Sequence, residues 1–530
     1  MAGVAFLLAV PCLAHGLYSW MGFSPTDDGF ILAYSRRILD GQVPHRDFIS
    51  IRPVGSALVH APVVLLGGEA TLWLSRLAVW FQFACVAWVW TGIILRLLGL
   101  RMGVAQRVLL ALAATMLSSH NFPMMAWHTT DAIFLSTLGV ALGMRDPMWA
   151  KVGGSVLLGL ACLCKQNFVM MVPIALLLLG EWRRVWLWVS AAAPAACYLA
   201  FLLAAGAAPD AWAQMRSQEG MLGVAFVQYA ATWFFPGGIL LGWVAAWLAR
   251  RAAPFLSVAG ALVQCGIPVF FMAAIAKGMH FSEPAFLLFG AVVGTALCDM
   301  LRRRVARLRV AGLLLGLGWT ASISFGYQSP VLVAGPLGVL LICAAIDTLG
   351  AASPMAPVGR FRALLPLAAA AAIALPYHTV RREQVYLDRP ARELTERLDG
   401  VFPGAARLHT NPNTHAALVD LRAAIARTGG KRYAIVPDFA GYWVKARERN
   451  PLPIDWPQGT ELSSPRVLQR VLDCLEAQRG QIVVIVQKFD ARFLNLGIEP
   501  LADPGRFRVA HYVRERFIKI GDTPFFELYE

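Results

Sequence analysis

Charged residues are scarce in this chain of 530 residues: Asp, Glu, Lys and Arg together make up 15%, whereas apolar residues make up 58%. Soluble domains carry roughly 25% charged and about 45–50% apolar residues, so this excess of apolar surface cannot be hidden inside a water-soluble fold. The mean hydropathy of +0.58 agrees with that reading. The composition therefore excludes an ordinary soluble protein and predicts a protein of the lipid bilayer.

Several signatures of soluble chemistry are missing as well. Eight of the nine cysteines lie in apolar segments and only Cys474 lies in a polar region, so we expect no disulfide framework. The polar C-terminal part has no Gly-rich phosphate loop, no Cys/His metal spacing and no G-x-S-x-G motif. Acidic residues are outnumbered by basic ones, 32 to 47, which gives a net charge of +15. In a membrane protein such an excess belongs to cytoplasmic loops, so no nucleic-acid partner is expected.

Thirteen apolar segments are candidate membrane spans, because a spanning helix needs about 20 mostly apolar residues. They lie near residues 2–21, 70–98, 104–119, 130–145, 150–164, 168–181, 185–205, 228–248, 255–276, 284–301, 310–325, 331–347 and 361–378. The connections alternate between Arg-rich loops, which the positive-inside rule assigns to the cytoplasm, and Arg-poor loops, which face outward. The first outward loop is 22–69. The first segment lacks a basic leader and a clear cleavage site, so we expect a retained helix and not a signal peptide.

The composition changes near residue 379, where charged residues become frequent. Helical patterns over 392–398, 414–427 and 465–478 alternate with β-branched runs at 433–437 and 481–487. The predicted fold is therefore a polytopic α-helical membrane domain (1–378) followed by a small extracytoplasmic α/β domain (379–530). No motif in the second domain indicates chemistry. The segment 437–443 follows a predicted strand end, where α/β sheets often bind ligands, and its aromatics could meet a sugar. We favour the alternative, in which Tyr442 and Trp443 pack the domain onto the membrane surface.

The outward loop 22–69 carries an adjacent pair of acids, Asp27 and Asp28, followed by a helical pattern that ends near Asp40. Ile31 and Tyr34 lie on one side of that pattern and Arg37 on the other, so the helix should lie along the membrane surface. Two adjacent carboxylates can ligate a hard cation or remove a proton from an acceptor hydroxyl. The alternative is that one of them merely caps the helix. We favour the functional interpretation, because capping does not explain the basic and aromatic residues just beyond.

The run from Asp27 to Phe48, with its Gly41-x-x-Pro44-x-Arg46-Asp47 close, resembles the first extracytoplasmic loop of the GT-C superfamily of glycosyltransferases. It is most similar to the bacterial family 39 type, related to dolichyl-phosphate-mannose protein mannosyltransferases, although those relatives usually show Asp-Glu in place of Asp27-Asp28. The span end at Lys165-Gln166-Asn167 is also similar to that group.

The resemblance implies an inverting transfer of a sugar from a polyprenyl-phosphate donor to an acceptor hydroxyl at the outer face of the cytoplasmic (inner) membrane. Asp27 would be the general base, with Asp28 supporting it or ligating a metal. Lys165 would meet the donor phosphate. His280 and Glu283 match only by their place in a late outward loop.

The residues themselves point to the same chemistry. A phosphate leaving group needs positive charge in a site of low dielectric. Candidate donor-phosphate ligands at the outer ends of spans are Arg46, Arg52, Lys165, Lys277 and His280. Lys and Arg also extend to lipid headgroups without further role, which is the alternative for each of them.

Two further sets of side chains are candidates. Trp127, His128 and Asp131 could contact sugar hydroxyls and C–H faces, or else serve as an interfacial aromatic and a helix cap. Asp28 and Glu283 are candidate ligands of a divalent cation, Mg²⁺ or Mn²⁺, although Glu283 could simply open a helix.

Two other functions compete with the glycosyltransferase. A transporter or flippase of a lipid-linked saccharide would commonly show internal repeats and polar groups in the middle of spans. No repeat is evident, and the polar residues gather at the outer ends of spans, which favours an active site at the membrane surface. A non-enzymatic assembly or receptor protein is the second rival. The expected partners are a polyprenyl-phosphate sugar, a glycan, lipid or protein acceptor, and membrane lipids.

Overall fold

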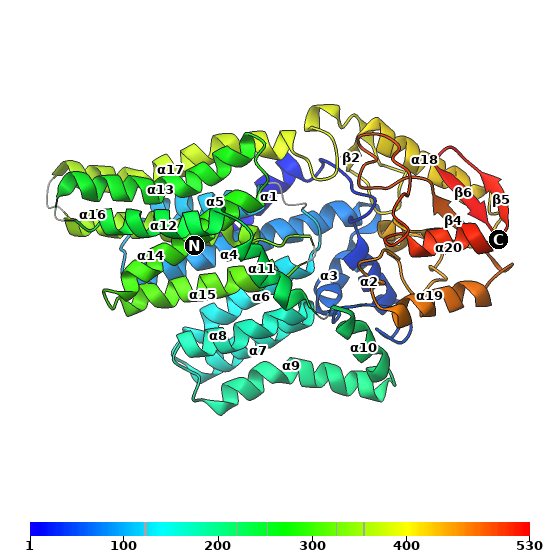
Figure 1. Cartoon of the computed structure of the whole chain (residues 1–530), viewed down its shortest axis with the longest axis horizontal. Helices are drawn as coiled ribbons and strands as arrows, with labels where there is room; N and C mark the ends of the chain where they lie inside the picture. The colour runs from blue at the N-terminus through cyan, green and yellow to red at the C-terminus, as the bar shows by residue number, and fades with distance from the viewer. Residues whose placement is uncertain (121–123, 219, 252, 325, 353–355) are drawn as a thin grey trace.

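The computed structural model describes the whole chain except residues 121–123, 219, 252, 325 and 353–355. A long helical bundle occupies one end of the molecule and an α/β domain occupies the other (Figure 1). The helices of the bundle are α1 (Ala2–Tyr18), α4 (Thr71–Leu97), α5 (Val104–Ser119), α6 (His128–Gly143), α7 (Met148–Cys164), α8 (Met171–Leu178), α9 (Val185–Ala204), α10 (Ala208–Met215), α11 (Met221–Ala230), α12 (Phe234–Leu248), α13 (Pro254–Ala276), α14 (Ser282–Met300), α15 (Val305–Ser322), α16 (Ala334–Ala352) and α17 (Ala356–Glu383).

The bundle is that of a polytopic helical membrane protein. Among the described residues, six helical segments are long and apolar enough to cross a membrane, or up to seven if the bent pair Gly223–Ala230 and Phe234–Leu248 is one span. The predicted count of thirteen is therefore not confirmed. Several predicted spans are short helices: the 17 residues of α1 and of α7 rise only about 26 Å, less than the hydrocarbon core of about 30 Å.

Small residues let neighbouring helices of the bundle approach closely. A Cβ on Gly294 of α14 would come within 2.0 Å of the Ile239 carbonyl oxygen of α12, and one on Gly242 within 2.1 Å of the Ala291 carbonyl oxygen. Such close backbone contact is how helices associate where no hydrophobic effect drives them together. Substitution at either glycine would push α12 and α14 apart.

The C-terminal domain has a four-stranded sheet in the order β3-β4-β6-β5. Its strands are β3 (Arg432–Val436), β4 (Ile482–Gln487), β5 (Lys519–Asp522) and β6 (Phe526–Tyr529), and its helices are α18 (Pro412–Ala426), α19 (Pro465–Ala477) and α20 (Arg508–Arg516). β3 and β4 are parallel, whereas β6 pairs antiparallel with both β4 and β5. A separate ribbon joins β1 (Glu396–Arg397) to β2 (His409–Thr410).

Most of the secondary structure predicted for this domain is confirmed. The helix predicted over 392–398 is wrong, because a 3-10 turn at Ala391–Glu393 leads directly into β1. The residue that caps α18 is Asn411, whose side chain accepts a hydrogen bond from the Thr414 N–H at 3.0 Å. The helix therefore begins at Pro412, two residues before the predicted start at 414.

The outward loop folds into α2 (Phe30–Leu39) and α3 (Gly55–Leu66), which lie between the bundle and the C-terminal domain (Figure 1). The expected position of α2 along the membrane surface stays a prediction, but the helix is largely enclosed by protein. Its apolar side chains from Phe30 to Tyr34 are buried, and Arg37 on the other side forms a buried ion pair with Asp455 of the C-terminal domain at 2.6 Å. Both sides of α2 therefore have protein partners, so the loop that carries Asp27 is fixed between the two parts of the chain.

Candidate active site

A cavity of about 400 Å³, here called the main cavity, lies where the Asp27 loop, the ends of α6 and α7 and the C-terminal domain meet. Ten of the residues that line it belong to the bundle and the outward loop, and eight follow α17. Cavities with a few convergent polar groups are the usual place of binding and catalysis.

The turn before α2 presents the acidic pair. The Asp27 N–H donates to Ser24 Oγ at 3.2 Å, and the Asp28 N–H donates to the Ser24 carbonyl at 2.9 Å. The residue at the cap of α2 is Gly29, with φ +89°, and no side chain caps the helix. A side chain at Gly29 would also collide with the Cα of Gly441, 2.6 Å away. The capping alternative for Asp27 and Asp28 is therefore not what the structure shows.

Asp27 lines the main cavity and is only 7% exposed. Its Oδ2 accepts a hydrogen bond from the Tyr386 hydroxyl at 2.8 Å. Burial raises the pKa of Asp27 to about 7; the Tyr386 hydrogen bond opposes this rise, whereas the nearby Asp438 and Asp28 add to it. A carboxyl that exchanges its proton near neutral pH is suited to general acid–base catalysis.

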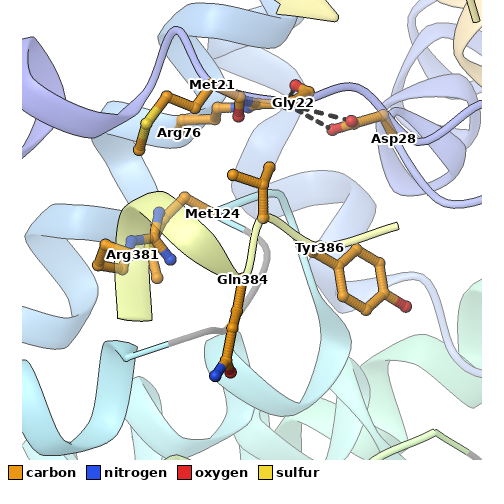
Figure 2. A pocket seen from close by; sticks show the side chains of 9 residues that line it. Met21, Gly22, Asp28, Arg76, Met124, Arg381, Gln384 and Tyr386 are labelled. Carbon is orange, nitrogen blue, oxygen red and sulfur yellow. Dashed lines mark hydrogen bonds and ion pairs between the residues drawn. The ribbon is translucent and has the colours of Figure 1, made fainter. Parts of the chain in front are cut away.

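Asp28 points elsewhere. Its Oδ2 accepts from Arg76 Nη2 at 3.1 Å and from the Ser24 N–H at 2.9 Å. Figure 2 shows this pair beside a small cavity that Arg381 and Tyr386 also line. Arg76 further donates to the backbone carbonyls of residues 19, 21 and 22. Asp28 is thus engaged in holding the loop, while Asp27 faces the main cavity.

Two of the predicted cations, Arg52 and Lys165, line the main cavity. Arg52 Nη1 pairs with the buried Glu461 Oε1 at 2.7 Å, and Lys165 Nζ donates to Thr129 Oγ1 at 2.8 Å. Both also line a second cavity of about 510 Å³, here called the apolar cavity. Its wall is largely apolar, and Val169 and Trp212 in that wall are 52% and 64% exposed. The two basic side chains therefore border both cavities, and the second cavity has the more apolar wall.

The predicted sugar-contacting residues are divided by the structure. Trp127 and His128 line the main cavity, and Trp127 lies edge-on to Phe30 with ring centroids 5.5 Å apart. His128 is buried, and neither of its ring nitrogens has a hydrogen-bond partner in the described part of the chain. Asp131 does not line the cavity: its Oδ1 accepts from Gln82 at 2.7 Å and from His60 at 3.0 Å inside the bundle.

The remaining candidates lie outside the main and apolar cavities. Arg46 is exposed and pairs with its neighbour Asp47 at 2.8 Å. Lys277 and His280 are exposed in the turn before α14, and Glu283 lies in the first turn of that helix. The predicted roles of Arg46, Lys277 and His280 in donor binding stay predictions.

The predicted metal ligands do not come together. The carboxylate of Asp28 is taken up by Arg76 and a backbone N–H, and Glu283 is absent from the lining of the small and main cavities. Within the described ranges, no three His, Cys, Asp or Glu side chains are grouped as a metal site requires. These residues as placed do not fit a divalent cation, and a requirement for Mg²⁺ or Mn²⁺ stays a prediction.

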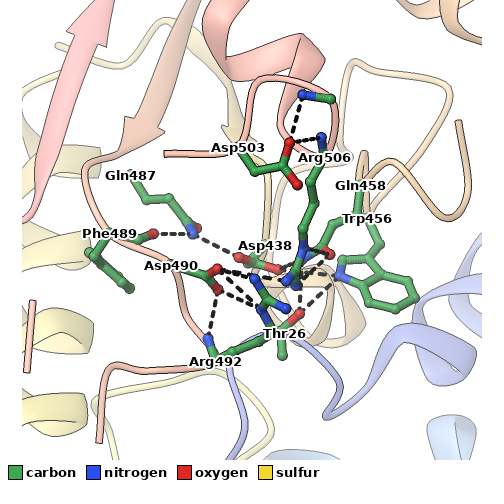
Figure 3. Close-up of polar contacts among 11 residues, drawn as sticks. Thr26, Asp438, Trp456, Gln458, Gln487, Phe489, Asp490, Arg492, Asp503 and Arg506 are labelled. Atoms are coloured by element: carbon green, nitrogen blue, oxygen red, sulfur yellow. Dashed lines mark hydrogen bonds and ion pairs between the residues drawn. The ribbon is translucent and has the colours of Figure 1, made fainter. Parts of the chain in front are cut away.

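The C-terminal domain contributes residues to the cavity that the sequence did not indicate: Trp456, Gln458, Thr460, Glu461, Arg492 and Arg506. Figure 3 shows how Trp456, Gln458, Arg492 and Arg506 are held. Asp438, at the end of β3, accepts from Gln487 at 2.7 Å and from the Trp456 indole at 3.3 Å, and Gln458 donates to Thr26 at 2.9 Å. The position of Asp438 was the one signal in the sequence for this part of the site. It follows a predicted strand, and the carboxyl ends of parallel strands commonly carry sites in α/β domains.

Neither a protein-family model nor a curated protein matches the sequence. Among solved structures, the chain is similar to the crystal structure of ArnT from Cupriavidus metallidurans bound to undecaprenyl phosphate. The two chains share 14% sequence identity, and the match covers 99% of this chain and 97% of the other with a TM-score of 0.44. A likeness at this TM-score supports no inference about family or function.

Proposed function

We propose that the protein is a membrane glycosyltransferase of the GT-C type that moves a sugar from a polyprenyl-phosphate donor to an acceptor hydroxyl, with inversion. The observation that carries the proposal is a single arrangement. A buried acid that titrates near neutral pH, Asp27, shares one cavity with Arg52 and Lys165, and these two cations also border an apolar cavity.

The order of these features matches the order of groups in the donor. A polyprenyl phosphate sugar has an apolar chain, then an anionic phosphate, then a polar ring. The apolar cavity, the Arg52–Lys165 pair and the main cavity follow in the same order. Positive charge at the middle position stabilises the phosphate as its bond to the sugar breaks, and does so most strongly where water is excluded.

Asp27 supplies the base for the acceptor. Its carboxylate removes the proton from the acceptor hydroxyl as that oxygen forms a bond to the anomeric carbon. The bond between the anomeric carbon and the phosphate oxygen breaks on the opposite face, and the phosphate keeps the electron pair. Because this is one displacement, the configuration inverts. Asp27 then returns its proton to solvent, for which a pKa of about 7 is suited.

The walls of the main cavity suit a sugar ring. Phe30, Trp127 and Trp456 offer aromatic faces to C–H groups, and the unpartnered ring nitrogens of His128 can bond hydroxyls. His128 is therefore the strongest candidate for direct sugar contact among the predicted residues.

The site also bears on location. Arg-rich connections on one side of the bundle indicate the cytoplasm, which makes the Asp27 loop extracytoplasmic. Asp27 and Trp456 line one cavity, which supports a C-terminal domain on the same side of the membrane as that loop. We therefore place both at the outer face of the cytoplasmic (inner) membrane.

Binding of the donor phosphate can be tested with undecaprenyl phosphate as the probe and native mass spectrometry of the purified protein. The double variant Arg52→Gln/Glu461→Gln removes the cation without leaving a buried carboxylate unpaired. Arg46→Gln/Asp47→Asn removes an equivalent pair from the exposed loop. We expect the first variant to lose at least tenfold in affinity and the second to bind nearly as the wild type. The reverse result would place the phosphate at Arg46 and contradict the proposed site.

Catalysis can be tested by release of polyprenyl phosphate from envelope lipid extracts, measured by mass spectrometry. The wild type should release it, Asp27→Asn should not, and Asp47→Asn should behave as the wild type. A transporter would bind the lipid but release no phosphate in any variant, so that outcome would favour the rival function.

A further inference from the structure

The segment that joins α17 to the C-terminal domain lies against the acidic loop. α17 ends at Glu383, and Tyr386 and Asp388 follow within this linker. Figure 2 shows Tyr386 projecting from the linker near the Asp28–Arg76 pair, and Tyr386 lines both the small and the main cavity. Tyr386 therefore borders both the cavity beside Asp28 and the cavity beside Asp27.

The contact between Tyr386 and Asp27 is specific to one oxygen. The Tyr386 hydroxyl donates to Asp27 Oδ2 at 2.8 Å. Within the described part of the chain, Oδ1 of the same carboxylate accepts no hydrogen bond, and Asp27 lines the main cavity. One oxygen is thus held and the other is left available.

Asp388 fixes the linker in place. It accepts hydrogen bonds from the Phe23 N–H at 3.0 Å, from the Thr410 hydroxyl at 2.8 Å and from the Asn411 side chain at 2.7 Å. Phe23 begins the acidic loop, whereas Thr410 and Asn411 belong to the C-terminal domain. The linker therefore ties the loop to that domain two residues away from Tyr386.

We propose that Tyr386 is a positioning residue for Asp27: its hydroxyl fixes Oδ2 and leaves Oδ1 to accept the proton of the acceptor hydroxyl. The catalytic consequence rests on the proposed function, whereas the contact itself does not. A carboxylate without this tether could rotate, and misplacement of a base by even a short distance lowers the rate of proton transfer.

The surroundings of Asp27 give the direction of the effect. The groups that face it are Asp28 from its own loop, Asp438 and Arg492 from the C-terminal domain, Tyr386 from the linker and Tyr327 from the loop after α15. Among those that lower its pKa, the Tyr386 hydrogen bond is the largest. Loss of the hydroxyl should therefore keep Asp27 protonated to a higher pH.

Labelling with dicyclohexylcarbodiimide tests this directly, because the reagent modifies protonated carboxyls in apolar surroundings. The full-length protein would be labelled over a pH series, and modification at Asp27 read by peptide mass spectrometry. In Tyr386→Phe we expect the midpoint of labelling to move upward by about one pH unit or more, since the lost bond is to a charged group. The control is Tyr198→Phe, which removes a hydroxyl bonded to His45 at the same 2.8 Å and should leave the midpoint unchanged.

A second perturbation does not depend on how well Tyr386→Phe folds. Replacement of Tyr386 by 3-fluorotyrosine keeps the ring and makes the hydroxyl a stronger donor, so the midpoint should move downward. An unchanged midpoint in both Tyr386 variants, or an equal shift in Tyr198→Phe, would overturn the proposal.

Failure of this inference is distinguishable from failure of the proposed function. If labelling shifts but the wild type releases no polyprenyl phosphate, the positioning contact stands and the glycosyltransferase proposal fails. Release of polyprenyl phosphate would also be measured over a pH series, where it should fall at low pH as Asp27 becomes protonated. If release depends on Asp27 but this fall does not move to higher pH in Tyr386→Phe, the positioning role fails. A merely structural role of Tyr386 would lower the amount of active protein without changing the pH at which release falls.

Discussion

Replacing each of the two adjacent acids by asparagine should change stability in opposite directions. Burial raises the pKa of Asp27 from 3.8 to about 7, so the folded state resists the charged form. Each pKa unit corresponds to about 1.4 kcal/mol, which makes the cost of the ionised Asp27 about 4 kcal/mol. The carboxyl ionises near pH 4 in the unfolded chain but only near pH 7 in the folded protein. The cost is therefore absent below about pH 4 and complete above about pH 7.

Asp27→Asn therefore removes the cost. The asparagine side chain still offers an oxygen to the Tyr386 hydroxyl, so the hydrogen bond at this position can persist. We expect Asp27→Asn to inactivate the protein while raising its stability by up to about 4 kcal/mol at about pH 8. The gain should disappear as the pH falls toward 4.

Asp28→Asn should do the reverse. It breaks the buried pair with Arg76, whose guanidinium keeps three backbone carbonyls but loses its counter-charge. The expected loss is about 3–5 kcal/mol, the usual cost of removing one partner of a buried ion pair. The same chemical change at neighbouring positions thus provides its own control.

Thermal unfolding of the purified protein in detergent would measure both effects. At about pH 8 the melting temperature of Asp27→Asn should exceed that of the wild type by several degrees, and the two should converge only as the pH falls to about 4. Asp28→Asn should melt below the wild type. Destabilisation by Asp27→Asn, or a difference from the wild type that does not change with pH, would refute the assignment of Asp27 as a reluctantly ionised acid.

Three further outcomes are expected. Trp456→Ala should lower transfer by about tenfold and Trp456→Phe by much less, because an aromatic face in the cavity wall is lost only in the first; equal losses would point to the indole N–H instead. Arg37→Met should destabilise the docking of the C-terminal domain by about 3–5 kcal/mol, since it leaves the buried Asp455 without its ion-pair partner. The double variant Arg37→Met/Asp455→Asn should recover most of this loss, and limited proteolysis would measure both effects. Release of polyprenyl phosphate should continue in EDTA, because Arg52 and Lys165 supply the positive charge; loss of release, restored by Mg²⁺ or Mn²⁺, would instead support the predicted cation.

The membrane class and the acidic loop could be predicted because both depend on local sequence. Apolar composition reports the solvent of a helix, and Asp27-Asp28 stands out beside aromatic and basic residues whatever the fold. The number of spans could not be predicted as well, since hydropathy does not show where a helix ends or bends. The 65° bend between Gly223–Ala230 and Phe234–Leu248 is an example.

The division of the site among the candidates required the tertiary structure. Arg46 and Arg52 look alike in sequence, and only the docking of Glu461 shows that Arg52 faces the cavity. Trp456 reaches Thr26 across 430 positions of sequence, a distance at which no local pattern carries information. Asp27 and Asp28 likewise differ through distant partners, Tyr386 and Arg76.

The most direct test compares the glycans and glycolipids of the cell envelope by mass spectrometry in cells with the wild-type gene, without the gene, and with Asp27→Asn alone. One sugar modification should vanish from the second and third strains while the variant protein stays inserted at normal abundance. Full restoration of that modification by Asp27→Asn would show that the carboxyl group facing the main cavity is not the base, and the mechanism would be wrong.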